Sequence, residues 1–227
     1  MTAAPLPERL PIFPLTGAML LPRGYLPLNI FEPRYKEMVE VARSGSGIIG
    51  MVQPSQAKIS SSLENNDQFG TAERGRPLYD VGCAGLISNF EESNNGQYII
   101  VLTGLRRFKI KKELPKEYQF REVLADYSPY MEDGDDISLF DDEYKDPFIR
   151  LLNEYFNAFD IDMDVNEFYD IPHEELVNSM AMICPFEASE KQLLLESPTC
   201  KTRVQMMMQL MDFNLRKHDI SSDNIIH

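Results

Sequence analysis

The sequence contains few cysteines and no long apolar run. Its three cysteines, Cys83, Cys184 and Cys200, are scattered, odd in number and form no CxxC motif. This argues against a disulfide framework and against a structural zinc site. No stretch approaches the roughly 18 apolar residues that a membrane-spanning helix needs, and the N-terminal MTAAPLPERL lacks the apolar segment of a secretory signal. We therefore expect a cytoplasmic protein that is not bound to a membrane.

Motifs typical of hydrolases and nucleotide-binding proteins are also missing. Neither GxSxG nor HExxH occurs, and the glycine-rich stretch 70–77 lacks the lysine and the Ser/Thr of a P-loop. Ser189 and Lys191 lie two residues apart in a predicted helix, so they do not share a face. His173 follows Pro172 in the first turn of a helix, where a polar residue is ordinary. With no nucleophile beside a base, we expect no catalytic residues and no cofactor.

One acidic stretch partly follows the pattern of a calcium-binding loop. Residues 160, 162 and 164 are aspartates and residue 166 is Asn, which is the early spacing of such a loop. The pattern then requires Gly where Val165 stands and a bidentate Glu where Ile171 stands. A solvated loop whose aspartates cap helices explains the stretch better, and no metal is expected.

Positive charge is scarce in the last two fifths of the chain. Residues 1–130 hold 15 Lys and Arg against 14 Asp and Glu, whereas residues 131–227 hold 7 against 22, a net charge of −15. An acidic surface repels nucleic-acid phosphates and anionic lipids, so neither is an expected partner. The change near residue 130 also suggests an architectural boundary.

Prolines divide the apolar N-terminal stretch into short extended pieces. Residues 10–15, 18–22 and 25–31 are expected to form short, kinked strands that turn corners, as in a small barrel. Pro33 suits the first turn of a helix, which continues with apolar residues at helical spacing and ends near Gly45 and Gly47. The apolar residues are Tyr35, Met38, Val39 and Ala42.

Further strands are predicted up to residue 130. Residues 47–54, 78–93, 97–110 and 118–130 have strand character, and residues 94–96 (Asn-Asn-Gly) suit a hairpin turn. The polar stretch 54–77 is predicted to be a long surface loop. In the basic stretch 105–112, alternation places Phe108 and Ile110 inward and Arg107, Lys109 and Lys111 outward, which explains the cations without nucleic acid.

Helices are predicted after an acidic linker at 131–146. Asp146 and Pro147 suit the N-cap and first residue of one helix, and Ser189 with Gln192 has the spacing of a capping box in another. A helix at about 172–184 lies between them, and a long final helix opens with Ser197-Pro198. The sequence therefore predicts an α+β protein: a β-domain with one helix over 1–130, the linker, and a bundle of about four helices over 147–227.

The last helix is apolar on more than one side. One stripe packs naturally against other helices; it contains Val204, Met207, Met208, Met211 and Leu215. A second stripe contains Met206, Leu210 and Phe213. It either packs between the bundle and the barrel or forms a peptide-binding surface, for which methionine is suited because its side chain is flexible and polarizable. These three residues are the candidate site.

Several motifs, in this order and spacing, resemble the N-terminal domain of Lon proteases, and in particular bacterial proteins that consist of that domain alone. The motifs are LPIFPL, LP…LPLNIFEPRY, IGMV, LYDVGCAGLI and GLRRFKI. The resemblance covers nearly the whole chain. It implies a PUA-like β-domain followed by a helical bundle, a role in binding unfolded or degron-bearing polypeptide, and a role in assembly. The ATPase and Ser–Lys protease modules of full-length Lon are not recognisable in this sequence, so we do not expect their activities.

Three hypotheses follow. The first is a non-catalytic module that binds exposed apolar polypeptide segments. The second is an adaptor or regulator that docks on a separate protease or another complex through its acidic helical half. The sequence leaves open whether the protein forms a homo-oligomer. The third, less favoured, is a small hydrolase with an unrecognised site.

Overall fold

The computed structural model describes residues 6–55, 76–133 and 142–223. Most of the predicted loop 54–77, its P-loop-like glycines and much of the linker 131–146 lie outside these ranges. The strands are β1 (Arg9–Pro14), β2 (Tyr25–Ile30), β3 (Ile48–Val52), β4 (Val81–Glu92), β5 (Tyr98–Glu113) and β6 (Arg121–Asp126). The α-helices are α1 (Pro33–Ser44), α3 (Lys145–Ala158), α4 (His173–Ile183), α5 (Ala188–Glu196) and α6 (Cys200–Asp223), and short 3₁₀ turns cover Ser128–Tyr130, Asp142–Tyr144 and Val165–Asp170.

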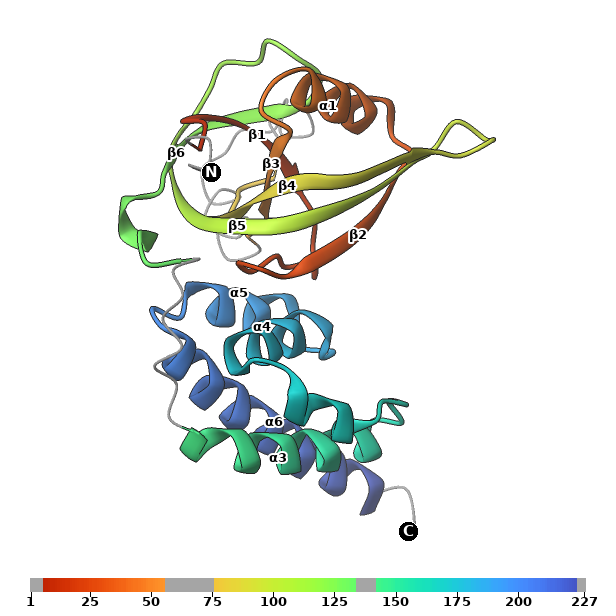
Figure 1. Ribbon diagram of the computed structural model, residues 1–227, viewed down its shortest axis with the longest axis vertical. Helices are drawn as coiled ribbons and strands as arrows, with labels where there is room; N and C mark the ends of the chain where they lie inside the picture. Colours follow the sequence, from red (N-terminus) through yellow and green to blue (C-terminus); the bar gives the residue numbers. More distant parts are fainter. Residues whose placement is uncertain (1–5, 56–75, 134–141, 224–227) are drawn as a thin grey trace, which may run out of the picture.

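The six strands form one sheet that closes on itself. Their order is β2-β5-β4-β3-β1-β6, and β5 pairs additionally with β6. The first half of β5 pairs with β2 and its second half with β6. Five strands therefore close a small barrel, and β2 is attached outside the ring through β5 (Figure 1).

Both faces of the sheet are buried, which explains why its strands are so apolar. Alternate residues of a strand point to opposite faces. In β3, Ile48 and Val52 join a cluster around Phe108, whereas Ile49 and Met51 join a larger cluster that includes residues of α1 and of the C-terminal helices. One continuous core thus connects the barrel to the helices.

The predicted strand at 18–22 is wrong. Residues 19–21 are buried but lie in a loop that crosses β5 closely. A Cβ built on Gly104 would lie 1.9 Å from the Leu21 carbonyl oxygen, so only glycine lets the two backbones approach this closely. Arg23 N–H donates to the Gly104 carbonyl at 2.9 Å, which fixes the loop against the middle of β5.

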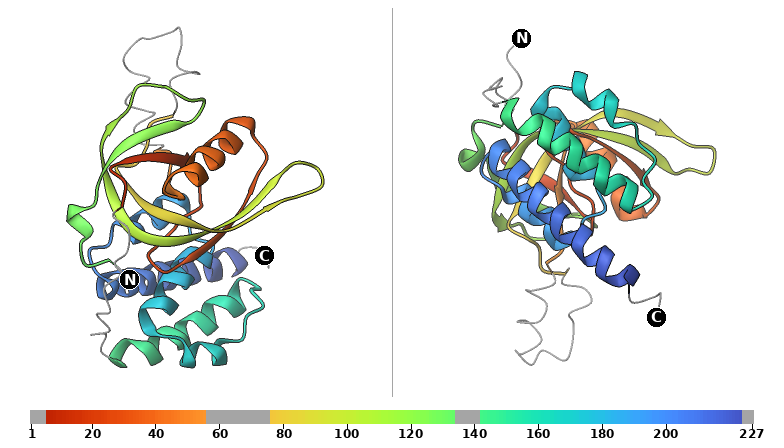
Figure 2. Two further views of the ribbon diagram at one scale, coloured as in Figure 1. Left: turned by 45° about the horizontal axis from the view of Figure 1, so that its top comes forward. Right: turned by 90° about the horizontal axis from the view of Figure 1, so that it is seen from below.

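The four C-terminal α-helices lie on one side of the barrel. Helices α4 and α5 are nearest to the sheet, and α3 and α6 lie beyond them (Figures 1 and 2). Helix α1 lies on a different side of the barrel and buries Met38, Val39 and Ala42 as predicted. The α+β class is therefore confirmed. Among the helices described, none combines the length and the apolar character needed to cross a bilayer.

Three predicted details at helix starts are wrong. Helix α3 has Tyr144 at its N-cap, so Asp146 and Pro147 lie inside its first turn. The capping box of α5 is formed by Glu187 and Glu190, because the helix starts two residues earlier than the pairing of Ser189 with Gln192 requires. Helix α6 begins at Cys200, two residues after the predicted Ser197-Pro198 opening. Thr199 and Thr202 exchange backbone-to-hydroxyl hydrogen bonds at this start, as a capping pair does.

Arg107 was expected to point into solvent and is instead buried, with 3% of its surface exposed. Its guanidinium donates to both carboxylate oxygens of Asp133, at 2.8 and 2.7 Å. It also donates to the carbonyl oxygens of Leu195 and Ser197 at the C-terminal end of α5. A cation is favourable there because helix C-termini carry unpaired carbonyls and partial negative charge. Strand β5 is thereby tied to the helices.

Other buried polar side chains join the same two parts. Gln53, just after β3, donates to the Ala188 carbonyl at 3.0 Å and to Gln192 at 3.2 Å. Asn178 of α4 donates to the Pro22 carbonyl at 3.0 Å and accepts from Arg203 at 2.7 Å. Because these groups are satisfied by partners from both parts, the orientation of the helices against the barrel is specific.

We expect Arg107→Met to lower the free energy of unfolding by about 3 kcal/mol, because it leaves the nearly buried Asp133 carboxylate without its cation. Urea denaturation measures the change. Lys109→Met removes the same charge from an exposed position two residues along β5 and should change stability by less than about 0.5 kcal/mol. Equal effects of the two substitutions would contradict the role given to Arg107.

Candidate functional site

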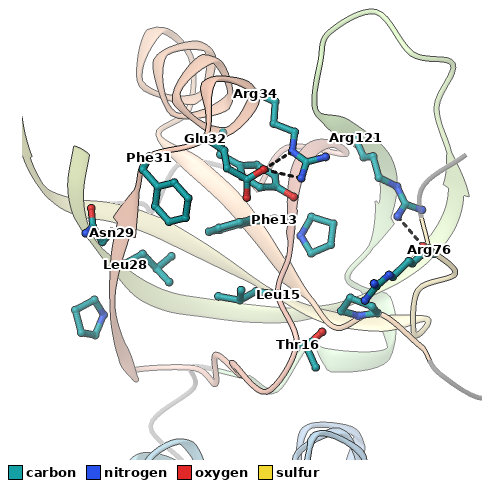
Figure 3. A pocket seen from close by; sticks show the side chains of 14 residues that line it. Phe13, Leu15, Thr16, Leu28, Asn29, Phe31, Glu32, Arg34, Arg76 and Arg121 are labelled. Atoms are coloured by element: carbon teal, nitrogen blue, oxygen red, sulfur yellow. Dashed lines mark hydrogen bonds and ion pairs between the residues drawn. The ribbon is translucent and has the colours of Figure 1, made fainter. Parts of the chain in front are cut away.

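A groove with a volume of about 670 Å³ lies on the barrel, between β2 and the end of β1 (Figure 3). Its lining comes from the end of β1, from β2, from the start of α1, and from three single residues at positions 54, 76 and 121. The lining residues are Phe13, Pro14, Leu15, Thr16, Pro27, Leu28, Asn29, Phe31, Glu32, Arg34, Tyr35, Pro54, Arg76 and Arg121.

One side of the groove is apolar. Phe13 and Leu15 point toward Leu28 and Phe31 across the space between β1 and β2 (Figure 3). Phe13 and Leu28 are nearly buried, whereas Phe31 exposes 65% of its surface. A phenylalanine that remains this exposed beside other apolar side chains is typical of a surface that another molecule covers.

Helix α1 fixes the upper end of the groove. Pro33 at the start of α1 sets the backbone dihedral angle of the first helical residue, and Glu32 at the N-cap is extended. This brings Tyr35 against Phe13, with ring centroids 4.3 Å apart. The apolar wall therefore rests on a packed helix rather than on a free loop.

The other side of the groove is basic. Arg121 donates to both carboxylate oxygens of Glu113 at 2.7 Å, and Arg34 donates to Glu32 at 3.0 and 2.7 Å. Arg76 is exposed, and its guanidinium has no hydrogen-bond or ion-pair partner within the described ranges. Three arginines against one glutamate give the lining a net positive charge in a chain of net charge −14.

The comparisons with known proteins agree on a family. Residues 9–212 match the family model of the ATP-dependent protease La (LON) substrate-binding domain. The chain belongs to this family. The Lon substrate-binding domain thus accounts for nearly all of the described residues, and the predicted resemblance is confirmed.

Curated relatives are whole Lon proteases. Lon protease of Flavobacterium johnsoniae is 22% identical over 224 residues, which are 96% of this chain and 26% of that protein. Lon protease of Anaeromyxobacter dehalogenans is 26% identical over 226 residues, 95% of this chain and 24% of the relative. The chain spans about a quarter of the length of these relatives.

Solved structures show the same fold. The Lon N-terminal domain protein from Xanthomonas campestris has a TM-score of 0.61 at 17% identity and covers 88% of this chain and 97% of its own. The N-terminal domain of Mycobacterium avium complex Lon protease has a TM-score of 0.62 at 15% identity, covering 90% and 98%. At these identities the likeness concerns the Lon-domain fold.

The candidate residues of the last helix lie apart from the groove. Met206 and Leu210 are half-buried and pack against the core, and Phe213 exposes 62% of its surface. None of the three lines the groove. Met206 and Leu210 therefore pack against other residues, whereas Phe213 is exposed as a binding surface requires. The role of the stripe in binding stays a prediction.

The groove itself was missed from sequence. Phe31 stands in an apolar run and resembles a core residue there. The available signal was alternation: Tyr25, Pro27 and Asn29 face outward on β2, and Phe31 has the same parity.

Asp164 and two of the three cysteines have surroundings typical of structural residues. Asp164 caps the 3₁₀ turn at Val165–Asp170 by accepting from Asn166 N–H at 2.9 Å, as the capping interpretation predicted. No cluster of three His, Cys, Asp or Glu suited to a metal ion occurs in the described part of the chain. Burial raises the pKa of both the Cys184 and Cys200 thiols to about 12, so neither supplies a thiolate near neutral pH.

We expect iodoacetamide at pH 8 to modify Cys184 and Cys200 on the order of 1,000-fold more slowly in the folded protein than in urea. Each folded-state pKa lies about three units above the ordinary value of 9.0, so the thiolate fraction falls by about that factor. Mass spectrometry of the modified peptides measures both rates. Rapid modification of either cysteine in the folded protein would contradict its assignment as an inert thiol.

Proposed function

We propose that this domain is a non-catalytic module that binds polypeptide segments with exposed apolar side chains. Membership of the Lon substrate-binding domain family supports a binding role. The observation that carries the proposal is the groove, where the exposed ring of Phe31 faces Leu28, Phe13 and Leu15. An apolar side chain of another polypeptide would complete the burial of these residues, and burial of apolar surface is the main favourable term in such association.

The predicted surface on α6 is a second place where such a segment could be held. Phe213 is exposed to nearly the same extent as Phe31, and Met206 and Leu210 lie beside it on the helix. The two exposed phenylalanines therefore form a matched pair, one in the groove and one on the bundle. Comparing them decides which surface binds.

We expect Phe31→Ser to weaken binding of a reduced, alkylated model protein about tenfold, because covering a half-exposed phenylalanine is worth roughly 1.5 kcal/mol. Phe213→Ser should change the affinity less than twofold. Fluorescence anisotropy of the dye-labelled model protein measures both. Both substitutions are at exposed positions, so unfolding of the domain is not expected, and circular dichroism checks it.

The result of this comparison is decisive in either direction. If the unmodified domain binds the model protein no better than an unrelated acidic protein does, the proposed function is wrong. If Phe213→Ser weakens binding and Phe31→Ser does not, polypeptide binding stands but the surface is on α6.

The charge distribution favours a second function, that of an adaptor that docks on a separate protease or another complex. Residues 131–227 carry a net charge of −15, which would attract a basic partner surface. Such docking should weaken strongly between 50 and 500 mM salt, because exposed charges are screened. Association that is insensitive to salt would point back to the apolar groove. A hydrolase remains the least favoured function.

A further inference from the structure

The two sides of the groove differ in chemistry. On one side are Phe13, Leu15, Leu28 and Phe31, and on the other are Arg76 and Arg121, with the end of β1 between them (Figure 3). A segment that fills the groove must therefore place an apolar side chain on one side and face guanidinium groups on the other.

Arg76 is held at the rim of the groove by its backbone. Arg121 donates to the Arg76 carbonyl at 2.9 Å. The next residue, Pro77, accepts from Ser55 N–H at 2.7 Å, and Pro54 bridges to Leu78. The backbone of residues 76–78 is thus held by Arg121, Ser55 and Pro54, while the Arg76 guanidinium has no partner within the described ranges.

The other two arginines of the lining, Arg34 and Arg121, have intramolecular partners. Arg34 and Glu32 form an ion pair whose side chains expose 51% and 41% of their surface. An exposed pair of this kind contributes only roughly 0–1 kcal/mol, but Glu32 still cancels the charge of Arg34. Arg121 is held more firmly by its two bonds to Glu113. The positive charge available to a ligand is therefore centred on Arg76.

Resting on the proposed function, we propose that the groove selects polypeptide segments in which an acidic side chain accompanies a large apolar side chain. The apolar residue lies against Phe31 and Leu28, and the Asp or Glu carboxylate pairs with the Arg76 guanidinium. Arginine suits this task because its planar guanidinium can donate two hydrogen bonds to one carboxylate. The charge complementarity favours this occupant over a basic or an uncharged apolar segment.

Four labelled peptides of about 12 residues, all amidated at the C-terminus, test the proposal. The first contains Phe and Leu flanked by Glu, the second has Gln in place of Glu, the third has Lys, and the fourth keeps Glu but has Ser in place of Phe and Leu. Amidation removes the terminal carboxylate, so only an acidic side chain can supply the charge. Anisotropy titrations at 50 mM and 500 mM salt give the affinities.

We expect the Glu peptide to bind about fivefold more tightly than the Gln peptide at 50 mM salt, the size expected for one partly exposed ion pair. The Lys peptide should bind more weakly still, and the difference should shrink at 500 mM salt. Arg76→Glu should abolish the preference for Glu over Gln. Arg150→Glu is the matched control, since it makes the same charge change at an exposed position on α3 and should leave the preference intact.

The outcomes separate this proposal from the proposed function. Equal affinities for the Glu, Gln and Lys peptides would overturn the acidic selectivity while leaving apolar binding in place. A preference for Glu that persists in Arg76→Glu, or that Arg150→Glu also removes, would overturn the assignment to Arg76. If the Glu, Gln and Lys peptides all fail to bind, the proposed function itself is wrong.

Discussion

The guanidinium of Arg107 is the point on which the arrangement of barrel and helices depends. It projects from β5, which pairs with β2, β4 and β6, and it bonds to the Asp133 carboxylate and to the last carbonyls of α5. A buried cation is tolerated only where its donors are satisfied, and the partners here come from two segments, the one at Asp133 and the end of α5. The network is therefore formed only when β5, the segment at Asp133 and the end of α5 are all in place.

The groove on the barrel takes all of its lining residues from positions 13–121, before the C-terminal helices. Phe13, Leu28 and Tyr35 are placed by β1, β2 and α1, and their positions follow from strand pairing and from the Phe13–Tyr35 contact. Hydrogen bonds between the helices and the barrel lie at Gln53, at the Pro22 carbonyl and at Arg107. A groove built from paired strands and a packed helix is preorganised, which reduces the entropy lost on binding.

The sequence predicts the elements of this fold better than it predicts the positions of individual polar and apolar side chains. Proline spacing, the Asn-Gly turn and helical periodicity are local signals, and they give α1, β3, the β4–β5 hairpin and the order of the helices. Arg107 was misplaced because alternation gives the face of a residue but not what packs on that face. Here the C-terminal end of α5 lies against Arg107, so this one charge on the outward face of β5 is buried.

The groove was missed for a related reason. Its lining is collected from residues 13 to 121, and only the closure of the barrel brings these segments together. Phe31 ends an apolar run that is typical of the core, but it has the same parity as the exposed residues of β2. The stripe on α6, by contrast, lies within one helix, so periodicity could identify it, although periodicity cannot tell that Met206 and Leu210 pack on the core while Phe213 does not.

The charge pattern gives the two apolar surfaces different properties. The excess of acidic residues lies after residue 130, where α6 is, whereas the groove carries arginines in a part of the chain that is nearly neutral. Salt screens the negative charge of the bundle, so the bundle repels an acidic segment only weakly at distances beyond about 8–10 Å. When the segment reaches the groove, it meets the local field of Arg76. Exposed apolar side chains alone would accept many partners at either surface. In the proposed mode, a bound segment must have an apolar side chain and a carboxylate at a fixed place beside it. Binding in the groove then depends on two features of the segment, so a shallow site gains selectivity without a large buried area.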